Sequence, residues 1–175
     1  MSTIDDELTQ EEIDRQFQLW RTAPTKFWEV TNKRVEERPD SPNAYFGRHQ
    51  AWDRLGRLDL ALADLDKSLS LEDRSVTHDA RGKTLRGLGR YRAAIDVYNR
   101  AEQLEPIEWG GGFGPLFRAD CYAHLGEEAA ALADCETMPD DHWTPGMFGL
   151  PAGNKQDVAA ELCRRAAAAR ARRWG

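Results

Sequence analysis

The spacing of apolar residues along the chain predicts a series of amphipathic helices. In residues 91–104 the apolar positions Ile95, Tyr98 and Ala101 recur every three residues, which is close to the period of an α-helix. Leu62, Leu65 and Leu69 repeat this pattern in residues 59–71. Further helices are expected over residues 44–55, 78–88, 115–125 and 127–138. The pattern therefore favours an all-α fold.

Leu-Gly pairs recur along the chain and mark a repeating unit. They end at Gly56, Gly89 and Gly126, so the units are 33 and then 37 residues apart. Five residues after each glycine the chain reads ALAD (61–64), AIDV (94–97) and ALAD (131–134). Each glycine suits the left-handed residue that ends a first helix, and Ala61, Ala94 and Ala131 are small where a second helix would approach it. The near-constant spacing is typical of a repeat architecture.

These units resemble tetratricopeptide repeats, which are helix-turn-helix modules of about 34 residues. The middle copy carries the family's residue types at Gly82, Gly89, Ala94, Tyr98, Ala101 and Pro106. The copy before it departs from the family at His49, where a small residue is usual, and the copy after it departs at Cys135. The resemblance implies a right-handed superhelical stack of antiparallel helix pairs.

The repeats occupy most of the chain in the predicted domain organisation. An acidic tail (1–8) precedes a degenerate repeat (9–40), in which Ile13, Phe17 and Trp20 share one helix face. Three clearer repeats follow at 42–74, 75–107 and 112–138. Residues 139–154 form a Pro/Gly-rich loop whose apolar residues, Trp143, Met147, Phe148 and Leu150, are expected to pack onto the last helix pair. Residues 155–175, begun by Asn154 as N-cap, are expected to form a C-terminal capping helix with a basic end.

Charge and hydropathy narrow the range of partners. The net charge of −6 argues against a general nucleic-acid binder. The mean hydropathy is −0.70, and no apolar run in the sequence approaches membrane-spanning length. The polar, acidic start lacks the features of a secretory signal, so we expect a cytoplasmic protein. Residues 1–14 carry six acids and no base, whereas residues 162–175 carry five bases and no acid.

The residues capable of chemistry do not form a recognisable site. Cys121, Cys135 and Cys163 lie 14 and 28 residues apart, which fits neither a disulfide framework nor a zinc motif. The segment 135–142 contains Cys135, Asp140, Asp141 and His142, but a Pro-Asp turn that caps helix ends is the favoured interpretation. The run WGGGFG (109–114) lacks the Lys-Ser or Lys-Thr of a phosphate-binding loop and is expected to be a flexible linker. We therefore expect no enzymatic activity, metal or cofactor.

The resemblance to tetratricopeptide repeats also implies a binding surface on the concave face of the stack, where the first helices of the repeats hold a peptide or a partner helix. The corresponding residues are Asn43, Phe46, Gln50, Asp53, Arg54, Asp79, Lys83, Arg86, Phe113, Leu116, Asp120 and His124. A partner segment is expected near Lys83 and Arg86. The clamp that some members use for chaperone C-termini is absent, because its positions hold Phe46, Gln50, Ala80, Phe113 and Phe117.

The function predicted from the sequence is that of a small adaptor or scaffold. One alternative is a structural protein that forms a homodimer through an edge of the stack or through its oppositely charged ends. A second alternative is a metal-binding or enzymatic protein that uses residues 135–142. The sequence does not identify the partner, because the fold alone does not determine function.

Overall fold

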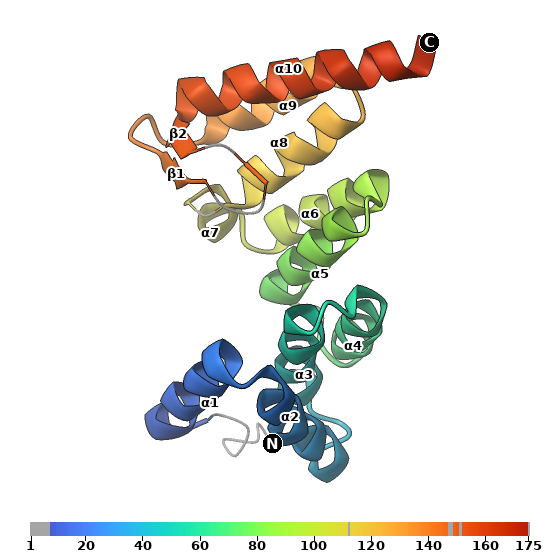
Figure 1. Ribbon diagram of the computed structural model, residues 1–175, viewed down its shortest axis with the longest axis vertical. Coiled ribbons are helices and arrows are strands. Elements are labelled where there is room, and N and C mark those ends of the chain that lie inside the picture. The colour runs from blue at the N-terminus through green and yellow to red at the C-terminus, as the bar shows by residue number, and fades with distance from the viewer. Residues whose placement is uncertain (1–7, 112, 147–148, 151, 175) are drawn as a thin grey trace. The chain divides into compact units, whose positions relative to one another are not determined.

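A computed structural model describes residues 8–111, 113–146, 149–150 and 152–174. The chain divides into two compact units, residues 1–84 and residues 85–175. The helix α5 (Ser75–Gly87) contains the boundary between them (Figure 1). Each unit is built from antiparallel helix pairs, so the predicted all-α fold is confirmed. The right-handed superhelical course of the whole stack stays a prediction.

The first unit contains α1 (Gln10–Thr22), α2 (Pro24–Glu37), α3 (Pro42–Arg54), α4 (Leu58–Leu71) and the start of α5. Thr9 and Glu12 form a reciprocal capping box on α1. Proline occupies the first turn of α2 and of α3, where it costs no helical hydrogen bond. Helix α3 packs between α2 and α4. Phe27, Ala44, Ala51 and Leu65 are buried in the core of this unit.

The second unit contains α6 (Tyr91–Leu104), α7 (Pro106–Gly111), α8 (Gly114–His124), α9 (Glu128–Thr137) and α10 (Lys155–Trp174). Helix α8 packs against α6 and α9, and α10 packs against α8 and α9. Asn154 caps α10 as predicted: its side-chain oxygen accepts from the backbone N–H groups of Gln156 and Asp157 at 2.9 and 3.0 Å. Val158, Leu162 and Ala166 form the buried stripe of this helix.

The turn glycines and the close-packed alanines confirm the repeat pattern. Gly56, Gly89 and Gly126 have φ angles of 70°, 72° and 79°, the left-handed conformation that ends a first helix. The alanines five residues later are 0, 0 and 1 % exposed. A larger side chain at these alanines would push the two helices of a pair apart.

The prediction of a flexible linker over 109–114 is wrong for the part that the structure describes. Residues Pro106–Gly111 form α7, and Trp109 is only 5 % exposed, with its ring 5.4 Å from that of Tyr98. Gly114 lies so close that a Cβ added to it would come within 2.4 Å of the Trp109 ring. Burial of this tryptophan orders the segment despite its glycines, while Gly112 lies outside the described residues.

The segment predicted as a loop over 139–154 contains a short antiparallel ladder. Strand β1 (Trp143–Pro145) pairs with β2 (Ala152–Asn154), with Thr144 opposite Gly153, and both strands lie against α10. Leu150 is buried as predicted. Trp143 is 63 % exposed, contrary to prediction, because neighbouring residues of a strand face opposite ways and the buried position belongs to Thr144. Met147 and Phe148 lie outside the described residues.

Each unit contains one arginine that joins three of its helices, and the two arginines do so in the same manner. Arg48 of α3 donates two hydrogen bonds to Asp64 of α4, at 2.8 and 2.7 Å, and a third to Asn32 of α2 at 2.8 Å. In the second unit Arg118 of α8 donates in the same way to Asp134 of α9 and Asn99 of α6. Its two bonds to Asp134 measure 2.9 and 2.7 Å, and its bond to Asn99 measures 2.8 Å.

The aspartates of these two clusters are the last residues of the two ALAD tetrapeptides. Val97 ends the corresponding AIDV tetrapeptide, so the middle repeat has no aspartate there. Its arginine, Arg81, instead donates to Asp66 of α4 at 2.6 Å. The repeats therefore share an arginine that joins its helix to the second helix of the preceding repeat, and two of them add a buried ion pair.

Candidate partner-binding groove

A groove runs between α1 and α3 of the first unit. It consists of two adjoining cavities of about 490 and 380 Å³, both lined by Leu8, Ile13, Gln16 and Gln50. Phe27 of α2 lies at its base and is 2 % exposed. We call this feature the α1–α3 groove. It gives the first unit a concave surface between the first helices of two successive pairs.

One wall of the α1–α3 groove is the apolar face of α1. Ile13 and Phe17 line it and are 45 and 54 % exposed, and Phe17 stacks on Trp20 with the ring centroids 5.9 Å apart. The sequence places these three residues on one helical face, but the structure shows that this face stays largely open. Exposed apolar residues that gather in a groove are typical of an interaction site.

The facing wall, on α3, is more polar. His49, Gln50 and Asp53 line it. Burial lowers the pKa of His49 to about 4. A hydrogen bond with the Phe46 backbone raises this pKa, whereas the charge of Lys83 lowers it further. The imidazole is therefore neutral at physiological pH. Desolvation raises the pKa of Asp53, against the opposing influence of Arg54.

Arg54 connects the two walls at their carboxyl-terminal ends. Its Nε donates to the backbone oxygen of Trp20 at 3.2 Å, and its guanidinium lies 5.0 Å from the centre of the Trp20 ring. This contact combines a hydrogen bond with a cation–π interaction. It fixes the separation of α1 and α3 at one end of the groove.

The site residues predicted in the first unit divide into those at the groove and those outside it. Asn43, Phe46, Gln50 and Asp53 line its two cavities. Asn43 accepts a hydrogen bond from Arg74 at 2.7 Å, and Phe46 lies against His49 with the ring centroids 4.6 Å apart. Neither Asp79 nor Lys83 is among the residues that line these cavities. They form an ion pair with each other at 2.5 Å.

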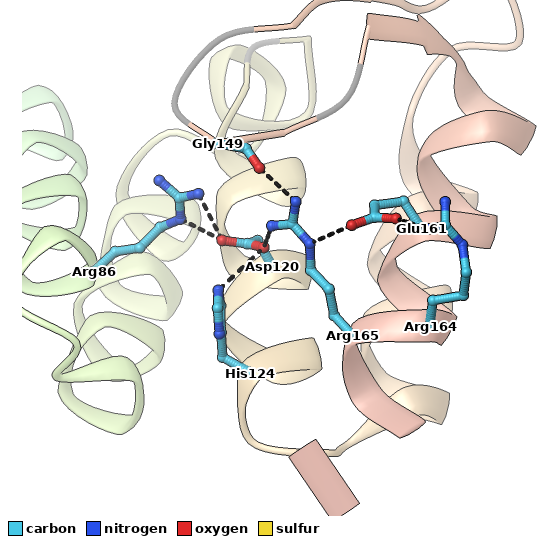
Figure 2. A network of polar contacts seen from close by, with 7 residues as sticks. All are labelled: Arg86, Asp120, His124, Gly149, Glu161, Arg164 and Arg165. Carbon is cyan, nitrogen blue, oxygen red and sulfur yellow. Dashed lines mark hydrogen bonds and ion pairs between the residues drawn. The ribbon is translucent and has the colours of Figure 1, made fainter. Parts of the chain in front are cut away.

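Several predicted site residues of the second unit form polar contacts with other parts of the chain (Figure 2). The Asp120 carboxylate is fully buried and accepts hydrogen bonds from Arg86 at 2.6 Å and from Arg165 of α10 at 2.7 Å. His124 lies 3.7 Å from the same carboxylate and stacks on Tyr91. Arg165 also donates to the backbone oxygen of Gly149. We call this arrangement the Asp120 network.

The Asp120 network pairs and largely buries Arg86, near which the sequence predicts a partner segment. The Arg86 side chain is only 13 % exposed, pairs with Asp120 and lies over the Phe117 ring. Leu116 is fully buried as well. Burial of a charged residue requires a partner, and here α10 supplies part of it through Arg165. Phe113 stays 37 % exposed, with its ring 5.7 Å from that of His142.

The cysteine of the segment 135–142 is buried. Burial raises the pKa of Cys135 to about 12, which disfavours the thiolate that a nucleophile or metal ligand would need. Burial raises the pKa of Cys121 to about 12 as well. Within the described part of the chain, no three His, Cys, Asp or Glu side chains gather so that they could hold a metal ion.

A lysine that the sequence interpretation overlooked fixes the start of α10. The Lys155 ammonium donates to the backbone oxygens of Glu136 and Met138, at 3.2 and 3.1 Å, and lies 3.4 Å from Asp140. It therefore satisfies carbonyl groups at the end of α9. In the sequence this lysine is recognisable only as the residue after the N-cap of a helix. Many exposed lysines occupy that position too, so the pattern did not single it out.

Comparison with known proteins agrees with this architecture. The sequence model of the tetratricopeptide repeat matches residues 77–108, which cover most of α5 and all of α6. The chain therefore contains a tetratricopeptide repeat, and its fold is that of the tetratricopeptide-repeat proteins. No curated protein matches the chain.

Several solved structures share this fold at low sequence identity. A MamA structure is 15 % identical, with a TM-score of 0.63 and coverage of 95 % of this chain and 98 % of that one. MamA of MSR-1 is 20 % identical, with a TM-score of 0.61 over 86 % of this chain and 73 % of its own. The C-terminal part of a TPR repeat-containing protein from Cytophaga hutchinsonii is 19 % identical, with a TM-score of 0.63 over 90 and 60 % of the two chains.

None of the helices in the described residues is both long enough and apolar enough to cross a bilayer.

Proposed function

We propose that the chain is a protein-interaction module that holds a segment of a partner protein in the α1–α3 groove. The tetratricopeptide fold supports a general role in protein interaction. The observation that carries the finer proposal is the open apolar wall of α1, where Ile13 and Phe17 are about half exposed beside a concave surface. Covering these side chains would remove apolar surface from water, which favours association.

The proposed groove retains four of the residues implied by the family resemblance, namely Asn43, Phe46, Gln50 and Asp53. It adds Ile13 and Phe17 from α1 and excludes Arg86, Leu116 and Asp120, which the chain itself buries. The partner position therefore moves from the middle repeat to the first unit.

Selection and titration of peptides test this proposal. A displayed library of random peptides about 16 residues long, enough for about four helical turns, is selected against the full chain. The affinity of a selected peptide is then measured by calorimetry for the wild type and for Phe17→Asp. We expect the variant to weaken binding by at least about tenfold, because an aspartate would introduce a charge into the apolar wall.

Val76→Asp is the matched control, because Val76 is 51 % exposed in α5 and lines neither cavity. Its affinity for the peptide is expected to equal that of the wild type. Equal binding by Phe17→Asp and the wild type would exclude the groove as the site.

We propose a non-enzymatic role. The high pKa of Cys135 supports this, because catalysis by that thiol would require its thiolate. His142, the other candidate in the segment, packs against Phe113 and lies 3.4 Å from the Thr144 hydroxyl.

Self-association through the charged ends stays a prediction, and the ion pairs of α10 reduce the charge available for it. Arg164 pairs with Glu161, and Arg170 pairs with Glu128, each at 2.6 Å. Sedimentation at low and high salt tests this alternative. A monomer in both conditions would exclude it.

A further inference from the structure

We infer that the segment held by the α1–α3 groove is an amphipathic α-helix with one Lys or Arg that pairs with Asp53. This inference rests on the proposed function and specifies the partner more closely. It makes Asp53 the residue that determines specificity and Ile13 and Phe17 the residues that supply apolar contact.

The helical form follows from the backbone of the groove walls. Both walls are α-helices, so their central N–H and C=O groups are already paired within each helix. They offer no edge to which an extended peptide could add its own backbone hydrogen bonds. An α-helical segment pairs its own backbone groups internally, so it can lie on the apolar wall without such an edge.

The spacing of the apolar wall fits such a partner. Ile13, Phe17 and Trp20 follow one another at i, i+4 and i+7, so they form a stripe along α1. Helix α1 has 13 residues and is therefore about 20 Å long. A partner helix of similar length with the same apolar spacing could cover the stripe.

The basic residue follows from the charge of the groove. Among the described residues that line the larger cavity, Asp53 is the single formal charge, because His49 is neutral. Arg34, which borders the smaller cavity beside the N-terminal half of α3, is the only other charged residue of the described lining. Among the described residues, none forms an ion pair with Asp53 like those of Asp64 or Asp120. An incoming cation would therefore complement the Asp53 end of the groove.

Desolvation at Asp53 strengthens this argument. Asp53 is an exposed residue, yet partial desolvation already raises the pKa of its carboxyl against the smaller effect of Arg54, whose guanidinium lies over Trp20. A helix that covers the groove would remove more water from this carboxylate. Without a cation, that helix would bind poorly, so Asp53 also rejects segments that are apolar or acidic at this position.

Four parallel selections with the displayed peptide library test the inference. The targets are the full-length wild type, Asp53→Lys, Phe17→Asp and the control Glu29→Lys, whose exposed residue on α2 lines neither cavity. We expect wild-type binders to combine apolar residues at helical spacing with a Lys or Arg at one fixed position. Asp53→Lys should select Asp or Glu there, whereas Glu29→Lys should return the wild-type pattern.

The outcomes separate the two levels of the proposal. If Phe17→Asp returned the same binders as the wild type, the proposed function itself would be wrong. If Phe17→Asp lost them but Asp53→Lys still selected Lys or Arg, the groove would stand and the inference would be overturned. Wild-type binders without helical apolar spacing would overturn the helical form.

A pairwise titration gives the magnitude. Replacing the basic residue of one selected peptide by Gln is expected to weaken its binding to the wild type by about tenfold, the effect of one hydrogen bond to a charged group. The same replacement should have no effect on binding to Asp53→Asn. A tenfold loss in both proteins would show that the basic residue acts elsewhere and would contradict the inference. Circular dichroism of each variant confirms that it is folded.

Discussion

Removing the guanidinium of Arg118 is expected to destabilise the second unit by about 3–5 kcal/mol, because it leaves a buried carboxylate without its partner. Arg118 and Asp134 are each 9 % exposed in their side chains. Burial disfavours the charged form of Arg118, but the hydrogen bonds that it donates to Asp134 and Glu102 outweigh this and raise its pKa. The proposed perturbation is Arg118→Met, which keeps most of the volume of the side chain.

The structure indicates which group causes this loss. Glu102 also binds Arg118, but its side chain is 42 % exposed, so water can replace the guanidinium there. The Asp134 carboxylate has no such access and bears most of the penalty. The double variant Arg118→Met with Asp134→Leu removes the stranded charge, so its stability should lie within about 1–2 kcal/mol of the wild type. This recovery distinguishes a charge effect from a loss of packing.

Urea unfolding followed by circular dichroism measures these free energies, and hydrogen exchange in α8 and α9 localises them to the second unit. Arg92→Met is the matched control. Its ion pair with Glu127 has side chains 59 and 36 % exposed, so water can replace either partner and its loss should cost far less stability than the loss of Arg118. The reasoning is refuted if Arg118→Met costs no more than Arg92→Met, or if the double variant is as unstable as Arg118→Met.

Three further predictions concern stability. Gly114→Ala should cost about 1–3 kcal/mol in urea unfolding, because its Cβ would come within 2.4 Å of the Trp109 ring; unchanged stability would contradict that contact. Lys155→Met should cost about 1–3 kcal/mol and increase hydrogen exchange at the start of α10, because the buried Met138 carbonyl and the partly buried Glu136 carbonyl lose their donor; unaltered exchange there would refute this role. The depressed pKa of His49, about 4 against an ordinary 6.5, means that the unfolded chain binds the proton first. The stability that the neutral His49 contributes to the folded chain is therefore fully present above pH 6.5, and the free energy of unfolding falls by about 3 kcal/mol as the pH drops toward 4. Urea midpoints across this range should show a steeper decline in the wild type than in His49→Leu, and parallel profiles would contradict the assignment.

The features predicted best from the sequence are those set by local geometry. The left-handed glycines, the small alanines and the Asn154 cap each depend on a few neighbouring residues, so their pattern recurs and can be recognised. The ordered segment around Trp109 was missed because three consecutive glycines favour flexibility locally, whereas burial of one tryptophan decides the outcome through tertiary contact.

The candidate site was predictable in part for the same reason. The family resemblance located Gln50 and Asp53 on α3, and helical periodicity placed Ile13 and Phe17 on one face of α1. Whether that face is buried or open depends on the separation of α1 and α3, which no local pattern encodes. Asp120 shows the converse, because a position that is open in an isolated repeat is covered here by Arg165 of α10.

The two buried arginine clusters had a signal in the sequence that can be recognised in retrospect. Arg48 precedes Asp64 by 16 residues, and Arg118 precedes Asp134 by the same interval. A charged pair conserved in spacing between two repeats, on positions that face each other across a helix pair, indicates a buried contact.

The central claim is that the α1–α3 groove is the surface that holds a partner segment. Titration of a library-selected peptide into the ¹⁵N-labelled full chain, followed by amide chemical shifts, tests it most directly. The account predicts that the largest shifts fall in α1 from Ile13 to Trp20 and in α3 from Phe46 to Asp53, with little change in α8 and α10. Shifts concentrated around the Asp120 network, with α1 unaffected, would contradict it.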